Sequence, residues 1–492
     1  VAEHYADRVE LVAARMRDYQ IKQQTQEYRN EQRVLSADPK NITGALEWAK
    51  SNGKDELVLK LCHGMSSYWR DRWQMNEALN YLPWGIAAAK AVASKTRDPN
   101  DRRRLANLEF IYASVLRRIG DLSQAERVFY RVLEVRRREG DRHREAEVWY
   151  QLGIISMMRR RLDRAESFFT QCLAVAQELD NRRDLSVVLS QLGRVARARG
   201  QLNDAEKLFN QSLALATDLP DQRLQGVLLG YLGRIARARG QLKVAEDLFN
   251  QSLAFARDQD EPDQRGEGRV LSHLGRIART RGQLEDAETY FHEALRIARQ
   301  VMDRQSEGAC LGYLGRIALA RAQDARKNPQ TARAYLKTAT VYFEESKRRA
   351  QQIQDQRGVS ISLSQLGRVA FEQGRLWEAS RQFHQSLRLT RRIGDRQNEG
   401  VNLYRLGRLA ELRGWKLWAD RLYGRAWKIA EQVDNQADIA DALLALGRIR
   451  VAHRSTRQDG CAKLKAAERI YDAMGMQKRA EARRELEKAG CA

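Results

Sequence analysis

Arginine recurs at one position of a repeated stretch of sequence, and its guanidinium group is the chemistry from which a function can be argued. LGRVARARG at 192–200 returns as LGRIARARG at 232–240 and as LGRIARTRG at 274–282. The arginine directly after the glycine occurs in seven successive copies, 40 to 52 residues apart: Arg194, Arg234, Arg276, Arg316, Arg368, Arg408 and Arg448. A guanidinium group offers N–H donors in a planar fork, which fits carboxylate and phosphate oxygens. The repeated arginine therefore predicts a site for an extended anion.

A second arginine lies three residues further on in the first three of these copies, as Arg197, Arg237 and Arg279. We call these ten side chains the arginine row. On a helix with about 100° between residues, Val188 and Val195 mark the apolar side, and the arginines point roughly the opposite way. Because stacking of helices must bury the apolar side, we expect the arginine row to stay accessible.

Two interpretations of the arginine row remain open. Its side chains line a ligand-binding groove, or each of them pairs with an aspartate or glutamate of a neighbouring copy. Duplication preserves a residue whether or not it is used, so repetition alone does not decide between them. A third group, Arg199, Arg239 and Arg281, lies at the turn that follows, and we expect these side chains to be solvated.

Motifs for catalysis are missing from the sequence. It contains no G-x-x-x-x-G-K-[ST], no G-x-S-x-G and no H-E-x-x-H, and its histidines do not pair with cysteine at metal-ligand spacing. We therefore expect no catalytic residue, no metal site and no cofactor. The five cysteines are scattered and never form C-x-x-C, which argues against a disulfide framework and suits a reducing cytoplasm.

The formal net charge of the 492-residue chain is +23. Such a charge favours acidic partners: an acidic protein face, nucleic acid or an anionic membrane surface. The sequence has no run of about 18 apolar residues and its N-terminus is charged throughout, so we expect no membrane span, no membrane partner and no secretory signal. Val1 in place of Met indicates a fragment or a processed product of a longer protein.

The elements that position the arginine row repeat with the same period. An alanine stands twelve residues after the glycine and an aromatic residue four later, as in Gly193, Ala205 and Phe209. Apolar residues recur at spacings of three and four on both sides of the turn at 200–201, which predicts two amphipathic helices per copy. Gly193 and Ala205 are small where the helices must approach closely, with Phe209 as the large residue beside them. A fixed period of this length indicates a stacked array.

This pattern resembles the tetratricopeptide repeat (TPR). The residues that carry the resemblance in one copy are Leu192, Gly193, Ala205, Phe209 and Ser212. Two positions depart from the family pattern, because Ala196 and Leu189 stand where the family has tyrosine and tryptophan, and the period is longer. The resemblance implies an all-α, right-handed α-solenoid of about nine to ten helix pairs with a 40–42-residue period. It also implies that the residues one and four after the glycine line a concave groove.

The first hundred residues resemble the segment that precedes the TPR sensor in STAND-type, MalT-like signalling ATPases. The matching residues are Asn41, Ile42, Ala45, Leu46, Trp48, Ala49, Trp69 and Ala78. The resemblance implies a signalling protein in which ATP drives switching and the TPR half recognises an inducer or partner. Physically, we expect four tryptophans of this segment to be core aromatics: Trp48, Trp69, Trp73 and Trp84.

Three regions are predicted: an N-terminal helical arm with a divergent TPR-like unit at 1–104, the array at 105–476, and a charged capping helix and tail at 477–492. About twelve extra residues within 322–338 either lengthen helices or form a loop on the binding face.

The predicted function is that of a non-catalytic TPR sensor or scaffold, part of a STAND-like protein, which binds an acidic protein or peptide through the arginine row. The alternatives are nucleic-acid binding and an anionic small-ligand sensor; self-association through the solenoid ends is another. Against nucleic acid, the middle of the groove offers no aromatic at the row positions for stacking bases.

Overall fold

The structure is a computed structural model of the chain. It describes residues 1–21, 25–36, 38–71, 74–96, 98–219, 222–258, 263–474, 476 and 478–491. These residues form α-helices joined by short turns, with two single-turn 3-10 helices and no strand, which confirms the predicted all-α solenoid class. In the described part of the chain, no helix combines the length and the apolar character needed to cross a bilayer.

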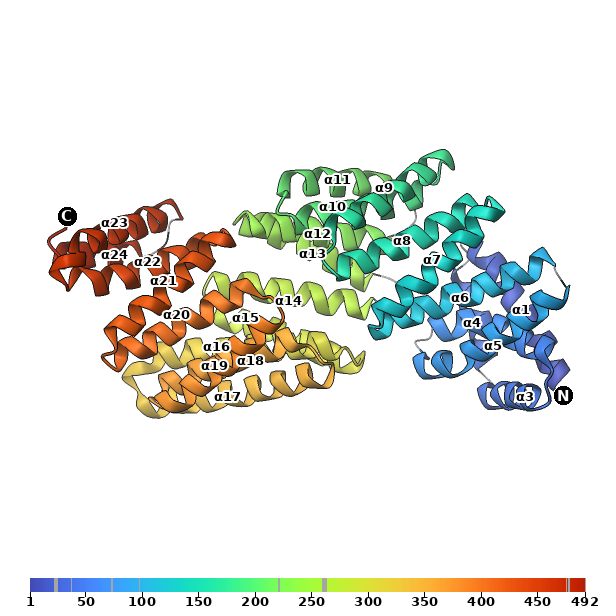
Figure 1. The fold of residues 1–492 in the computed structure, drawn as a ribbon, viewed down its shortest axis with the longest axis horizontal. Coiled ribbons are helices and arrows are strands. Elements are labelled where there is room, and N and C mark those ends of the chain that lie inside the picture. Colours follow the sequence, from blue (N-terminus) through green and yellow to red (C-terminus); the bar gives the residue numbers. More distant parts are fainter. Residues whose placement is uncertain are drawn as a thin grey trace. The chain divides into compact units, whose positions relative to one another are not determined.

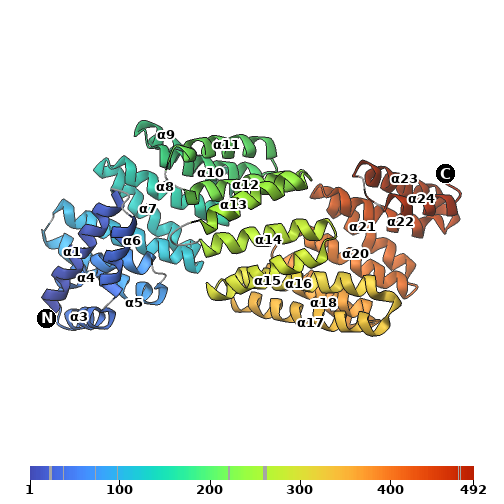
Figure 2. The ribbon, with the colours of Figure 1, turned by 180° about the vertical axis from the view of Figure 1, so that it is seen from behind.

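The chain divides into two compact units, Val1–Ile235 and Ala236–Ala492, with the boundary inside one helix, α12. Each unit consists of helices that pack against their neighbours in chain order (Figures 1 and 2). The first unit contains α1 (Ala2–Ile21), α2 (Thr25–Ser36), α3 (Pro39–Ser51), α4 (Asp55–Asp71), α5 (Met75–Thr96), α6 (Pro99–Ile119), α7 (Leu122–Glu139), α8 (Arg142–Met158), α9 (Leu162–Glu178), α10 (Arg182–Ala198), α11 (Leu202–Thr217) and most of α12 (Gln222–Ala238).

The second unit contains α13 (Leu242–Arg257), α14 (Gln264–Thr280), α15 (Leu284–Gln300), α16 (Arg304–Asp324), η1 (Ala325–Lys327), α17 (Pro329–Gln352), α18 (Gln356–Glu372), α19 (Leu376–Arg392), α20 (Arg396–Leu412), α21 (Lys416–Gln432), α22 (Gln436–Val451), η2 (Arg454–Thr456), α23 (Arg457–Ala473) and α24 (Arg479–Lys488).

Local sequence sets where the paired helices begin and end. The first helix of a pair follows Asp or Asn, whose side-chain oxygen accepts a hydrogen bond from the backbone N–H three residues later. Asp141, for example, accepts from the N–H of Arg144 at 3.1 Å. This cap satisfies one of the amides that a helix start leaves without a partner. The turn to the second helix uses glycine in the left-handed region, for example Gly200 at φ 84°. A residue with a Cβ rarely adopts that conformation, so glycine ends the first helix there.

In most pairs, the glycine of the first helix packs against an aromatic ring of the second helix. A Cβ added to Gly193 would lie 2.8 Å from the ring of Phe209, and one added to Gly367 would lie 2.5 Å from Phe383. Ala205 and Phe209 are fully buried. The predicted close approach at the glycine is therefore confirmed, and it recurs between Gly153 and Phe169, Gly275 and Phe291, Gly315 and Phe343, and Gly407 and Tyr423.

The extra residues within 322–338 lengthen two helices and add the short 3-10 turn η1 between them. Of the two alternatives from the sequence, the structure shows the longer helices. Asn328 caps α17 by accepting the backbone N–H of Thr331 at 3.2 Å. The pair then resumes its register, because Ala339 and Phe343 are buried like their counterparts in other repeats.

The N-terminal tryptophans differ in their environment. Trp69 is 1% exposed and belongs to the core of α1 to α6, and Trp84 packs partly buried against that core. Trp48 is 50% exposed, so its interpretation as a core aromatic was wrong. It lies on the outer side of α3, whereas Ile42, Leu46 and Ala49 of the same helix are buried. Trp73 lies outside the described residues.

The C-terminal end is tied back to the array. Cys461 in α23 and Cys491 after α24 form a disulfide bond, with their Cα atoms 5.5 Å apart. The scattered cysteines argued against a disulfide framework, and this one bond forms because α24 folds back along α23 and carries Cys491 to Cys461. Cys62, Cys172 and Cys310 are free and buried.

Candidate functional site: an arginine row

The arginine row lies on the first helix of successive pairs. It spans α10, α12, α14, α16, α18, α20 and α22 in the order Arg194 and Arg197, Arg234 and Arg237, Arg276 and Arg279, Arg316, Arg368, Arg408, and Arg448. Arg408 is exposed and the other nine side chains are partly exposed. On α10, Val188 and Val195 are buried. The arginines therefore lie on the accessible side of these helices, as the helical periodicity predicts.

Neutral side chains two residues before the glycine hold several of these guanidinium groups. Nη1 of Arg194 donates to Oε1 of Gln191 at 2.5 Å. In the second unit, Nη1 of Arg368 donates to Oε1 of Gln365 at 3.1 Å. An amide oxygen orients the guanidinium group without neutralising its charge.

Tyrosine replaces glutamine at this position in two other repeats. The ring of Tyr231 has the Cζ atoms of Arg194 and Arg234 at 5.9 and 5.8 Å from its centroid. The ring of Tyr313 has those of Arg276 and Arg316 at 5.6 and 5.2 Å. These are cation–π distances, so each ring positions two arginines of the row.

The row positions carry no aromatic residue in the middle of the row, yet two tyrosine rings lie beside them. The rings enter from a neighbouring helical position rather than from the row positions themselves. Tyr231 stacks on Phe209 at 5.0 Å, and Tyr313 stacks on Phe291 at 4.7 Å between ring centroids. Both tyrosines thus contact a phenylalanine and two guanidinium groups.

Most of the arginine row has no acidic partner. Within the described part of the chain, no carboxylate forms an ion pair with seven of its members: Arg194, Arg197, Arg276, Arg279, Arg316, Arg368 and Arg408. The Nε atoms of Arg197 and Arg279 are buried and lack a hydrogen-bond partner among these residues. Burial, followed by the charge of Arg194, lowers the pKa of Arg197.

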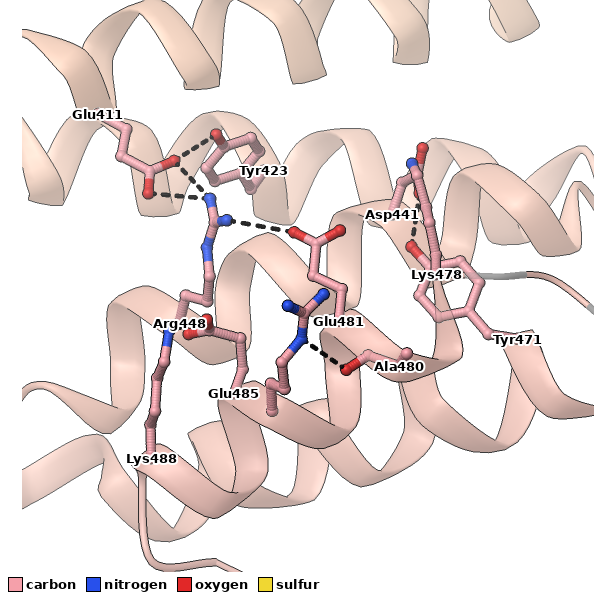
Figure 3. A network of polar contacts seen from close by, with 11 residues as sticks. Glu411, Tyr423, Asp441, Arg448, Tyr471, Lys478, Ala480, Glu481, Glu485 and Lys488 are labelled. Atoms are coloured by element: carbon pink, nitrogen blue, oxygen red, sulfur yellow. Dashed lines mark hydrogen bonds and ion pairs between the residues drawn. The ribbon is translucent and has the colours of Figure 1, made fainter.

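Arg448 is the exception, because it pairs with carboxylates, as the second interpretation of the row expects (Figure 3). Its guanidinium group lies 3.1 Å from Glu411 and 3.8 Å from Glu481. Glu411 also accepts a hydrogen bond from the hydroxyl of Tyr423 at 2.8 Å. Glu411 stands four residues after its glycine, where the central repeats carry the second arginine. The last arginine of the row is therefore paired with a carboxylate.

The turn arginines behave differently from the prediction that they are solvated. Arg199 pairs with Asp163 at 2.6 Å and with Glu166 at 2.7 Å, both in the preceding repeat. Arg281 pairs with Glu246 at 2.7 Å. Arginines at the same position of two other repeats do likewise, Arg159 with Glu126 at 2.6 Å and Arg321 with Glu288 at 2.7 Å. We call Arg159, Arg199, Arg281 and Arg321 the turn set.

Two further arginines on this side of the helices were missed by the sequence reasoning. Arg117 in α6 occupies the second row position of a copy that carries Ala113 in place of glycine, and its Nε is also buried without a partner in the described chain. Arg405 in α20 lies two residues before Gly407, where other copies have glutamine, tyrosine or histidine. Comparing that one position across the copies would have found Arg405.

The helix pairs, their glycine–aromatic contacts and the stacked array are those of a TPR-like α-solenoid. Models of the tetratricopeptide repeat match residues 104–178, 184–258 and 269–306, which confirms the family resemblance. No curated protein matches the chain in sequence.

Solved structures share the fold at low sequence identity. The human IFIT1 dimer with m7Gppp-AAAA is 15% identical, covers 91% of this chain and 95% of its own, and has a TM-score of 0.51. A STAND protein with a TPR sensor from Pyrococcus horikoshii is 15% identical, with 73% of this chain and 51% of that chain covered and a TM-score of 0.46. Aspartyl phosphate phosphatase F from Bacillus subtilis is 14% identical, with 74% and 92% covered and a TM-score of 0.47.

Proposed function

We propose that this protein is a non-catalytic TPR scaffold or sensor that binds an acidic protein or peptide along the arginine row. The observation that carries the proposal is the contrast between two sets of arginines. The turn set is neutralised by carboxylates of the neighbouring repeat, whereas among the described residues seven members of the arginine row form no ion pair with a carboxylate.

Duplication alone does not account for that contrast. If the arginines of the row had no function, acidic residues could stand beside them, as they do beside the turn set. Partly buried guanidinium groups repel one another and lose hydration, so leaving them unpaired has a cost. A ligand that supplies carboxylates removes this cost, and each Arg–carboxylate pair adds directional hydrogen bonds.

Nucleic acid is the second candidate, and the tyrosines bear on it. A binder of single strands stacks bases on open aromatic faces. Tyr231 and Tyr313 already contact phenylalanine and two guanidinium groups each, so their rings serve the arginines. The geometry therefore favours carboxylates over stacked bases as the ligand of the row.

The test compares two triple variants of equal charge change. Arg276→Gln/Arg279→Gln/Arg316→Gln neutralises the row, and Arg199→Gln/Arg281→Gln/Arg321→Gln neutralises the turn set. The probe is a fluorescein-labelled twelve-residue peptide of alternating Glu and Ser, with an all-Ser peptide and a twenty-nucleotide oligo(dT) beside it. Fluorescence anisotropy of each probe is measured at low and at physiological salt.

We expect the acidic peptide to bind, the row variant to weaken it at least about tenfold, and the turn variant to leave it unchanged. An equal loss of peptide affinity in both variants would show that only the net charge of the protein matters, and would overturn the assignment to the row. Tighter binding of oligo(dT) than of the peptide, lost in the row variant and steeply salt-dependent, would replace the acidic partner with nucleic acid.

The proposal also covers the larger protein to which the array belongs. We propose that it serves as the sensor part of a STAND-like signalling protein in the cytoplasm. Self-association through the ends of the array is a competing use of the same fold, and sedimentation of the full chain over a range of concentrations tests it.

A further inference from the structure

A cavity in the second unit gathers arginines from two helices. It has a volume of about 380 Å³, and its walls come from α16, α18, α20, α21 and α22, with Lys478 just before α24. Arg368, Arg405 and Arg408 form its cationic side. Val401, Ile429 and Val433 contribute apolar lining, and Tyr404 also lines the cavity.

Arg405 is held in place by a polar network from the interior. Its Nη1 donates to the backbone oxygen of Ser364 at 3.1 Å and to the hydroxyl of the same residue. Ser364 in turn donates to Asn402, whose amide donates to Ser386 at 2.9 Å. Ser364, Asn402 and Ser386 are all buried. The guanidinium group is therefore a preorganised donor that uses only one of its nitrogens for the fold.

Three carboxyl groups also line the cavity, and each is hydrogen-bonded to residues other than its three arginines. Glu372 accepts from Gln323 at 2.9 Å and from Arg326 at 3.1 Å, outside the arginine group. Asp441 accepts from Lys478 at 2.6 Å and from Tyr471 at 2.5 Å (Figure 3).

Asp438, the third carboxyl, is hydrogen-bonded to the amide of Asn435 at 2.6 Å and makes no ion pair with the described residues. Burial and then Asp441 raise the pKa of Asp438. Burial followed by Arg368, Arg316 and Arg408 lowers the pKa of Arg405 well below its usual range. Among the described residues, none of these three carboxyl groups forms an ion pair with Arg368, Arg405 or Arg408.

We propose that this cavity binds a phosphate monoester, with Arg368, Arg405 and Arg408 on the phosphoryl oxygens. A single carboxylate would offset one of the three charges, whereas a phosphate monoester carries about −1.5 to −2 at pH 7 and three acceptor oxygens. Guanidinium forks match those oxygens in pairs. The apolar wall beside Tyr404 then takes the organic part, and the cavity volume suits a small ligand.

The ester has two sources, a free metabolite or a phosphorylated side chain on a bound protein, and the chemistry at the arginines is the same. The cavity uses two arginines of the row, yet its occupation does not require an acidic protein to bind there. A negative result with the acidic peptide therefore leaves this proposal standing, and the reverse also holds.

The test is calorimetry of the full chain with phenyl phosphate, and with benzoate as a monoanion that carries the same ring. We expect saturable binding of phenyl phosphate at one site and at least about tenfold weaker binding of benzoate. Arg405→Gln and Arg408→Gln should each weaken phenyl phosphate about tenfold or more. Arg281→Gln is the matched control, because it removes one positive charge from the same unit, and Arg281 pairs with Glu246 and does not line the cavity.

Arg408 is exposed, so Arg408→Gln decides the matter even if Arg405→Gln disturbs the fold. No heat with 1 mM phenyl phosphate, or equal affinity in the Arg408→Gln variant and the Arg281→Gln control, would overturn the proposal. A phosphoserine peptide and its unphosphorylated form separate the sources. Tighter binding of the phosphopeptide than of phenyl phosphate assigns the site to a protein ligand, and weaker binding assigns it to a free ester.

Discussion

The arginine row and the turn set are two groups of the same residue, copied by the same duplication, with opposite surroundings. The turn set meets carboxylates of the preceding repeat at 2.6 to 2.7 Å. In the row, Arg194 and Arg368 meet amide oxygens, tyrosine rings lie beside Arg276 and Arg316, and Arg448 at the C-terminal end pairs with Glu411. Position in the repeat, and not residue type, decides which arginines pair with a carboxylate of the preceding repeat.

The difference also shows how a repeat array divides its charges. The turn set links each repeat to the one before it, so its contribution to stability is spread over many contacts between repeats, each of them small. The row concentrates charge of one sign on one side of each helix, which costs stability and favours binding of an anion. Four predictions test this division.

The largest effect is expected from charge reversal in the row. Arg276→Glu/Arg279→Glu/Arg316→Glu should weaken the acidic peptide about a hundredfold or more, because three attractions become repulsions. Anisotropy titration measures the affinity, and circular dichroism checks that helix content is retained. A loss of less than about threefold in a folded variant would contradict the role of the row.

A smaller effect, on stability, is expected from the turn set. Arg199→Gln/Arg281→Gln/Arg321→Gln should lower the free energy of unfolding by about 1–2 kcal/mol in total, since each partly exposed pair contributes a fraction of a kcal/mol. Urea unfolding followed by circular dichroism measures the change. An unchanged midpoint would show that these pairs, although regular, do not stabilise the joints.

Salt should stabilise the protein through its effect on the row. Added sodium chloride screens the repulsion among unpaired arginines, so the wild-type Tm should rise between about 20 and 150 mM salt. Arg316→Gln/Arg368→Gln should show a smaller rise, because two of the repelling charges are gone. Scanning calorimetry at both salt concentrations compares the two proteins, and equal salt responses would argue that the row is not under electrostatic strain.

The smallest effect is expected in a single pair. A double-mutant cycle of Arg199→Gln and Glu166→Gln should give a coupling energy of about 0.5 kcal/mol. The same cycle on Arg281 and Glu246 supplies a second pair with the same relation between repeats. A coupling of zero in both cycles would leave the regular contact without an energetic role.

Much of this fold could be predicted from the sequence because its signals are local and repeated. The spacing of Gly193, Ala205 and Phe209 predicts the contact that holds each pair, and the structure confirms it. Helical periodicity likewise places Arg194 and Arg197 on the accessible side. Trp48 shows the limit of such reasoning, because its type suggested a core residue while its place on α3 exposes it.

The sequence by itself determined the period, the helix pairs, the residues at their joints and the presence of an arginine row. Those features depend on residues within about one repeat of each other, where spacing and residue size carry the information. Only the tertiary structure decided which arginines find carboxylates, that tyrosines hold others, and that Arg405 joins Arg368 and Arg408 around one cavity. These contacts join separate helices that are neighbours only after stacking, and the geometry of the stack selects the partners.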